Sequence, residues 1–161
     1  LNHYSRKNDK KLTDCDIHAI IDNCIVMLQN QTKNRIEVQK VYTEKQHVIT
    51  GNEGKLHQVF VNLISNAEQA IEQRGTLEIS TEMTEEKAIV RLIDDGKGIS
   101  EDNLTKIMDP FFTTKPPGQG TGLGLSITKK IIKEHQGELK VSSKLNQGTI
   151  FVVELPITPA T

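Results

Sequence analysis

The stretch from Asp109 to Ile127, DPFFTTKPPGQGTGLGLSI, constrains the fold more than any other segment of the chain. Its glycines stand at positions 118, 120, 122 and 124, and an apolar helical pattern follows them. Glycine tolerates positive φ and lets the backbone approach a ligand closely. A glycine-rich run that leads into a helix also presents free N–H groups and the positive end of the helix dipole, which favours phosphate. A surface loop without a ligand is the alternative for this stretch taken alone.

Two common glycine patterns of nucleotide-binding proteins do not fit this run. Leu125 stands where the third glycine of a dinucleotide fingerprint would fall, and no Gly-Lys-Ser/Thr of a P-loop occurs in the chain. The 19 residues of this stretch do not by themselves identify a ligand for the glycines. The evidence has to come from the other 142 of the 161 positions.

Composition sets further bounds. A length of 161 residues suits one domain with its own core, and the net charge of −1 gives no basic surface for nucleic acid. No apolar run approaches the roughly 18 residues of a membrane span, and no signal peptide is visible. Because the chain starts at Leu1, we expect a fragment whose missing part could carry a targeting or membrane segment. Cys15 and Cys24 are expected to be buried free thiols of a reducing compartment.

Apolar spacing predicts three main helices. The first follows an N-cap at Asp16 and runs to about Gln31, and the last runs from about Leu123 to His135. The strongest is Glu53–Arg74, with Gly75 as its C-terminal stop. Its apolar stripe comprises Leu56, Val59, Phe60, Leu63, Ile64, Ala67, Ala70 and Ile71. A shorter helix is expected near residues 101–107.

Alternating and apolar runs predict the strands. They are Thr13–Cys15, Arg35–Thr43, Leu77–Met83, Ala88–Ile93, Glu138–Lys144 and Thr149–Leu155. Thr50-Gly51-Asn52 is expected to be a turn, and Glu85-Glu86 another. Neighbouring strands without an intervening helix favour hairpins, so we expect an α/β sandwich with a mixed sheet and helices on one face.

Asn62 and Asn66 lie four residues apart on the long helix and therefore share a face at the rim of its apolar stripe. Asparagine is a mediocre helix former, and its amide oxygen can ligate a hard cation such as magnesium. Solvent-exposed polar positions are the alternative. Asp94 ends an apolar strand and is followed by Asp95-Gly96-Lys97-Gly98. This segment is either a simple turn or a buried acceptor for an exocyclic amino group such as that of adenine.

In this order and spacing, the segments resemble the catalytic ATP-binding domain of sensor histidine kinases. That domain belongs to the superfamily that includes DNA gyrase B subunit, heat-shock chaperone and MutL ATPases. HQVFVNLISNAEQAI resembles the asparagine box, DDGKGI the first glycine box, DPFFTTK the phenylalanine box and GQGTGLGLSI the second glycine box, with Gln147-Gly148-Thr149 as the last glycine element.

The resemblance covers about residues 12–156 and implies a Bergerat-type fold, mostly antiparallel, with a glycine-rich ATP lid. Residues 1–11 would then be the end of a preceding helix and a linker, and residues 157–161 a C-terminal tail.

Carried over by position, the resemblance implies that Asn66 ligates magnesium and that Asn62 contacts phosphate or metal-bound water. Asp94 would accept the adenine amino group, with Gly96 and Gly98 shaping its pocket. The other implied positions are Thr149 as support for Asp94, Lys97 and Lys115 as phosphate contacts, Phe111 and Phe112 as lid anchors or core residues, and Gly120, Thr121, Gly122, Leu123 and Gly124 as the lid and the helix start. Asn62, Asn66 and Lys115 would form the catalytic set.

The family's nucleophile is a histidine on a separate dimerisation domain, which this chain lacks. The expected partners are that domain and a response-regulator receiver domain that takes the phosphoryl group on an aspartate, with no nucleic acid and no membrane contact by this fragment. The histidines here, at positions 3, 18, 47, 57 and 135, lack the acceptor-helix context and are expected to be surface or structural. The resemblance implies the bacterial cytoplasm, with a parent protein that could be membrane-anchored.

Position 62 separates two function classes. ATPases of the superfamily carry a Glu there as general base, whereas the amide of Asn62 takes no proton near neutral pH. The residue therefore favours transfer to a protein nucleophile over hydrolysis. An anti-sigma or serine-kinase relative and a nucleotide-binding regulatory module without transfer are the alternatives.

Overall fold

The computed structural model describes residues 12–112 and 124–157. Five strands form the main sheet, in the spatial order β2-β4-β5-β7-β6. Their bounds are Ile36–Val41 for β2, Gly75–Met83 for β4, Lys87–Asp94 for β5, Glu138–Lys144 for β6 and Gly148–Pro156 for β7. β2 pairs parallel with β4, and the other neighbours pair antiparallel. The expected mixed, mostly antiparallel sheet is confirmed.

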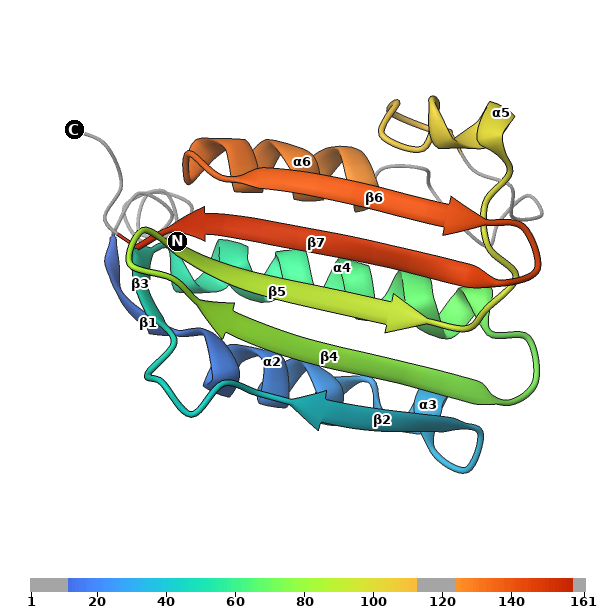
Figure 1. Ribbon diagram of the computed structural model, residues 1–161, viewed down its shortest axis with the longest axis horizontal. Helices are drawn as coiled ribbons and strands as arrows, with labels where there is room; N and C mark the ends of the chain where they lie inside the picture. Colours follow the sequence, from blue (N-terminus) through green and yellow to red (C-terminus); the bar gives the residue numbers. More distant parts are fainter. Residues whose placement is uncertain (1–11, 113–123, 158–161) are drawn as a thin grey trace, which may run out of the picture.

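Three helices cover one face of this sheet and leave the other face open (Figure 1). They are α2 (Ile17–Met27), α4 (Glu53–Ala70) and α6 (Gly124–Glu134). The two short helices are α3 (Gln29–Thr32) and α5 (Glu101–Leu104), the second of which is shorter than the helix expected over residues 101–107. The α/β sandwich with helices on one face is therefore confirmed.

The core lies between the helices and the sheet. α4 contributes the buried residues Leu56, Val59, Phe60, Leu63, Ile64 and Ala67, six of the eight positions of the predicted stripe. The sheet meets them with the inward positions of its central strands, namely Leu77, Ile79, Ala88, Val90, Leu92, Phe151, Val153 and Leu155. Each large aliphatic side chain buried in this way stabilises the fold by about 2 kcal/mol.

The turn expected at Thr50-Gly51-Asn52 is wrong. Residues Val48–Gly51 form strand β3, which pairs antiparallel with β1 (Thr13–Asp16) in a separate two-stranded sheet. A Cβ on Gly51 would lie 2.9 Å from Cδ2 of His135, so the glycine allows a close approach to the residue that follows α6 rather than a turn. Asn52 then caps α4 by accepting the N–H of Lys55 at 2.9 Å.

The long helix also ends earlier than expected, at Ala70 instead of Arg74. Ile71 leaves helical geometry and is buried, with 3% of its surface exposed. The carbonyl of Ala70 accepts the N–H of Lys97 at 2.9 Å, so a tertiary contact occupies it. Gly75 consequently begins β4 and is not a helix stop. Within the described ranges, no helix is long and apolar enough to cross a membrane.

Candidate functional site

Asp94 is the last residue of the central strand β5 and is buried, with 6% of its surface exposed. Its Oδ1 accepts the N–H of Gly96 at 2.9 Å, which folds the following loop back onto the carboxylate. Burial raises the pKa of the Asp94 carboxyl; the hydrogen bond from Gly96 opposes this, and the charge of Asp95 adds to it. A buried carboxylate with a free acceptor oxygen is suited to accept a hydrogen bond from an amino group.

Gly96 and Gly98 are required by the protein itself. A Cβ on Gly96 would lie 2.6 Å from the carbonyl oxygen of Ala70. Gly98 has φ of +71°, and a Cβ there would lie 2.0 Å from the carbonyl oxygen of Lys144. Because the two glycines lack a Cβ, the loop can pack closely between the end of α4 and the β6–β7 turn. The sequence suggested that they shape a pocket, and the structure adds the backbone contacts that fix the loop.

Thr149 lies opposite Asp94 in the β5–β7 register and is buried, with 4% of its surface exposed. Its backbone N–H lowers the pKa of Asp94, against the effect of burial. Its hydroxyl lies 2.8 Å from the hydroxyl of Ser143, which in turn donates to the carbonyl of Gly148. Thr149 thus bonds to Asp94 through its backbone N–H, where the sequence led us to expect its hydroxyl or a water.

Asn62 joins α4 to the first turn of α6. Its Nδ2 donates to the carbonyl of Gly124 and to the hydroxyl of Thr128, each at 3.2 Å. The Thr128 hydroxyl is fully buried and donates to the same carbonyl at 2.8 Å. Thr128 did not stand out in the sequence, because threonine within an apolar helical pattern gives no functional signal.

Asn66 lies one turn further along α4 and is half-buried. Ala70, one turn further again, accepts the N–H of Lys97 from the loop that follows Asp94. Asn62, Asn66 and Ala70 follow one another at four-residue intervals and therefore share a face of the helix. This row of three residues spans about 12 Å along α4. It places Asn66 between the start of α6 and the Asp94 loop.

A magnesium ion fits beside this row if ligands from outside the protein complete its coordination shell. None of the described residues hydrogen-bonds to the side chain of Asn66, so its amide oxygen is available. No group of three or more His, Cys, Asp or Glu side chains within residues 12–112 and 124–157 could hold a metal. Magnesium commonly binds through few protein ligands together with waters and phosphates, which suits a neutral amide donor beside a triphosphate.

Three further predicted positions differ in their exposure. Lys97 is exposed on the loop after Asp94. Phe112 packs against the core, whereas Phe111 is 72% exposed and has φ of 68°. Core packing, one of the two roles that were expected for these phenylalanines, thus holds for Phe112 but not for Phe111. Lys115, Gly120, Thr121, Gly122 and Leu123 lie outside the described residues, and Gly124 begins α6.

Comparison with known proteins gives the family. The profile of the histidine kinase-, DNA gyrase B- and HSP90-like ATPases matches residues 51–159. Sporulation kinase C of Bacillus subtilis is 40% identical over 129 residues, 80% of this chain and 30% of the relative. The histidine-protein kinase AtoS of Escherichia coli is 33% identical over 161 residues, 99% of this chain and 26% of the relative. The chain thus spans less than a third of these relatives.

The structure agrees with the sequence match. The nucleotide-free catalytic domain of histidine kinase ThkA superposes with a TM-score of 0.83 at 31% identity, over 92% of this chain and 99% of that domain. The mycobacterial sensor histidine kinase MprB shares the fold, with a TM-score of 0.82 at 23% identity. The family match and the sandwich fold define an ATP-binding catalytic domain. The chain belongs to the histidine kinase-, DNA gyrase B- and HSP90-like ATPase family, as a sensor histidine kinase catalytic domain.

Proposed function

We propose that this domain binds Mg-ATP and donates the γ-phosphoryl group to a histidine of a separate dimerisation domain, for relay to an aspartate of a response-regulator receiver domain. The observation that carries the proposal is the row on α4 that connects Asn62, Asn66 and the loop after buried Asp94. One face of one helix thereby meets the two segments that the sequence assigns to adenine and to phosphate.

In this proposal each residue has a chemical role. Asp94 accepts the adenine amino group, and Gly96, Gly98 and Thr149 fix the loop and strand around it. Asn66 holds magnesium, which neutralises charge on the phosphates. The proposed phosphate and lid positions are Lys97, Phe111, Phe112, Lys115, Gly120, Thr121, Gly122, Leu123 and Gly124.

Asn62 supports transfer over hydrolysis, because an amide does not deprotonate water at neutral pH. We further propose that residues 12–156 are the catalytic domain, that residues 1–11 end a preceding helix and linker, and that residues 157–161 form a tail. The relatives are bacterial kinases, which supports placing this domain in the bacterial cytoplasm, within a parent that a membrane anchor can hold.

Phosphorus NMR of the 161-residue chain with magnesium and ATP tests the proposal. We expect shifted or broadened ATP signals that persist without growth of ADP, because the site waits for a protein histidine. Steady growth of ADP and phosphate would identify a hydrolase instead. ATP signals identical to those of protein-free ATP would leave a domain that does not bind the nucleotide. Adding a dimerisation domain with an acceptor histidine should then produce phosphohistidine.

A further inference from the structure

Asn62 presents different atoms to its two sides. Its Nδ2 donates toward two acceptors on α6, the carbonyl of Gly124 and the hydroxyl of Thr128, each at 3.2 Å. These two acceptors lie 2.8 Å apart, so both lie on the same side of the amide nitrogen. None of the described residues donates to its Oδ1. Asn62 therefore turns its amide nitrogen to α6 and keeps Oδ1 available as an acceptor.

Thr128 fixes this orientation. Its hydroxyl has one hydrogen, which it donates to the carbonyl of Gly124 at 2.8 Å. Toward Asn62 it can only accept, and the carbonyl of Gly124 is an acceptor as well. Rotating the amide by half a turn would place Oδ1 against two acceptors, so the rotated state leaves buried polar groups unpaired. The fully buried position of Thr128 keeps water from replacing these bonds.

We propose that Thr128 is a positioning residue that holds the amide of Asn62 with Nδ2 toward α6 and Oδ1 toward the nucleotide, so that Oδ1 accepts a hydrogen bond from a magnesium-bound water. This inference rests on the proposed Mg-ATP function. It decides between two roles that the sequence left open, because phosphate oxygens need donors whereas a metal-bound water donates. Asn66 then remains the direct ligand, with Asn62 one turn away on the hydration shell.

The inference predicts a defect in metal coupling rather than in nucleotide affinity as such. We define the coupling as the Kd of ATP in EDTA divided by the Kd of ATP in magnesium, both measured by calorimetry on the 161-residue chain. Thr128→Val keeps the shape of the side chain and removes the hydroxyl. We expect it to lower the coupling about tenfold, the lower end of what partners of metal ligands contribute, and to leave the Kd in EDTA unchanged.

Two variants separate positioning from stability. Thr128→Ser retains the hydroxyl and should restore the coupling. Thr81→Val removes another buried hydroxyl, one that bonds His18 and the N–H of Thr43 at the opposite end of the sheet. It should lower the melting temperature without changing the coupling, which shows that lost stability alone has no such effect.

A second readout needs no nucleotide. The side-chain amide signals of Asn62 in a nitrogen–proton correlation spectrum should shift in Thr128→Val and stay near the parent positions in Thr128→Ser. Coupling equal to the parent's in Thr128→Val, or an equal loss of affinity with and without magnesium, would overturn the inference and leave the proposed function standing. A parent chain that fails to bind ATP would overturn both.

Discussion

The two ends of the sheet both bury polar side chains, yet they do so in different ways. At one end, Asp94 is held by backbone N–H groups, and the residues that touch it come from the loop after β5 and from β7. At the other, His18 stacks between Tyr42 and His47, with ring centroids 4.2 Å and 5.0 Å away. In Figure 1, α2 begins toward the side of the sheet where β5 starts, and β5 runs from there to its tip on the other side.

The stack is closed by partners of its own. His18 Nε2 lies 2.8 Å from the hydroxyl of Thr81, and Tyr42 donates to Asp22 at 2.9 Å. His47 Nε2 lies 3.1 Å from the carbonyl of Glu82, and its buried Nδ1 has no hydrogen-bond partner among the described residues. Burial of polar groups therefore does not by itself mark a site. The Asp94 end differs because the loop after Asp94 bonds to Ala70, on the face of α4 that carries Asn66 and Asn62.

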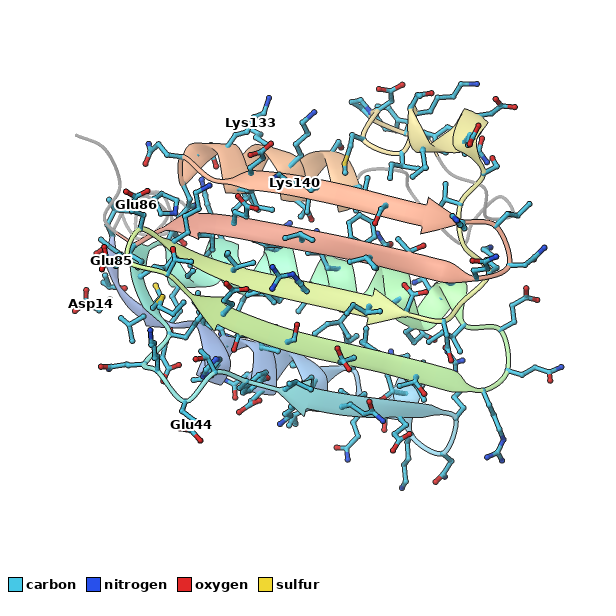
Figure 2. The ribbon with its side chains drawn as sticks, viewed as in Figure 1. Asp14, Glu44, Glu85, Glu86, Lys133 and Lys140 are labelled. Carbon is cyan, nitrogen blue, oxygen red and sulfur yellow. The ribbon has the colours of Figure 1, made fainter. Side chains whose placement is uncertain are left out.

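Charged side chains on the surface do not distinguish the two ends of the sheet. Figure 2 shows Glu85 and Glu86 projecting at the β4–β5 turn, at the end with the stack, and Lys133 projecting from α6. Charged side chains are thus spread over the periphery. The difference between the ends lies in buried geometry, which the following experiments address in order of expected effect.

Gly98→Ala should give the largest loss of stability. The new Cβ would meet the carbonyl oxygen of Lys144 at 2.0 Å, in a residue with φ of +71°. We expect the free energy of unfolding to fall by about 3 kcal/mol, measured by urea denaturation. Gly54→Ala is the matched control, because the nearest atom to its Cβ lies 3.6 Å away and the residue is helical. Equal effects in both variants would mean that the Asp94 loop is not held by this contact.

Asp94→Asn should separate binding from folding. Losing a charged acceptor for an amino group costs about 1.5–3 kcal/mol, or about 10- to 100-fold in the Kd of ATP. Because burial raises the pKa of the Asp94 carboxyl, the charged form destabilises the fold, and the amide should keep or raise the melting temperature. ATP titration and thermal denaturation measure the two effects. Unchanged affinity would show that Asp94 does not face adenine.

The histidine stack should respond to acid. Burial lowers the pKa of His18 and of His47 from the ordinary 6.5, against smaller opposing effects of Asp16, Asp22 and the Glu82 carbonyl. The unfolded chain therefore binds protons first as the pH falls through 6.5, and the free energy of unfolding decreases until the lowered folded pKa values are passed.

His47→Phe keeps a ring in the stack and removes one titrating group. Urea denaturation from about pH 8 to about pH 5.5, the range in which histidine titrates, should give a flatter profile for this variant than for the parent. ATP affinity at neutral pH should not change, because the stack lies at the other end of the sheet from Asp94. A parent profile without decline below about pH 6.5 would contradict the assignment.

The smallest effect is expected for Arg91→Ala. Arg91 pairs with Glu82 at 2.9 Å on the open face of the sheet, with 39% and 51% of the two side chains exposed. An exposed pair of this kind contributes about 0.5 kcal/mol or less, and salt screens it. The variant should match the parent in denaturation at moderate salt. A larger loss would mean that surface charge supports the neighbouring stack through Glu82.

Much of the fold followed from the sequence, because periodicity reports which face of an element is buried. The stripe on α4 predicted a buried helix face, and six of its eight positions are buried there. The alternation over Leu77–Met83 and the apolar run over Ala88–Ile93 likewise predicted adjacent strands of one sheet. The motif order resembled a known family, and the comparisons confirmed it.

The sequence alone fixed the residue types of the site: an acid at the end of the central strand, two asparagines one turn apart and glycines beside them. Only the tertiary structure decided what those residues touch. α4 ends at Ala70 because the Asp94 loop bonds to its carbonyl, and β3 exists because β1 pairs with it. The orientation of Asn62 depends on Thr128, which is 66 residues away. Contacts across such distances depend on packing, which no local pattern of residues encodes.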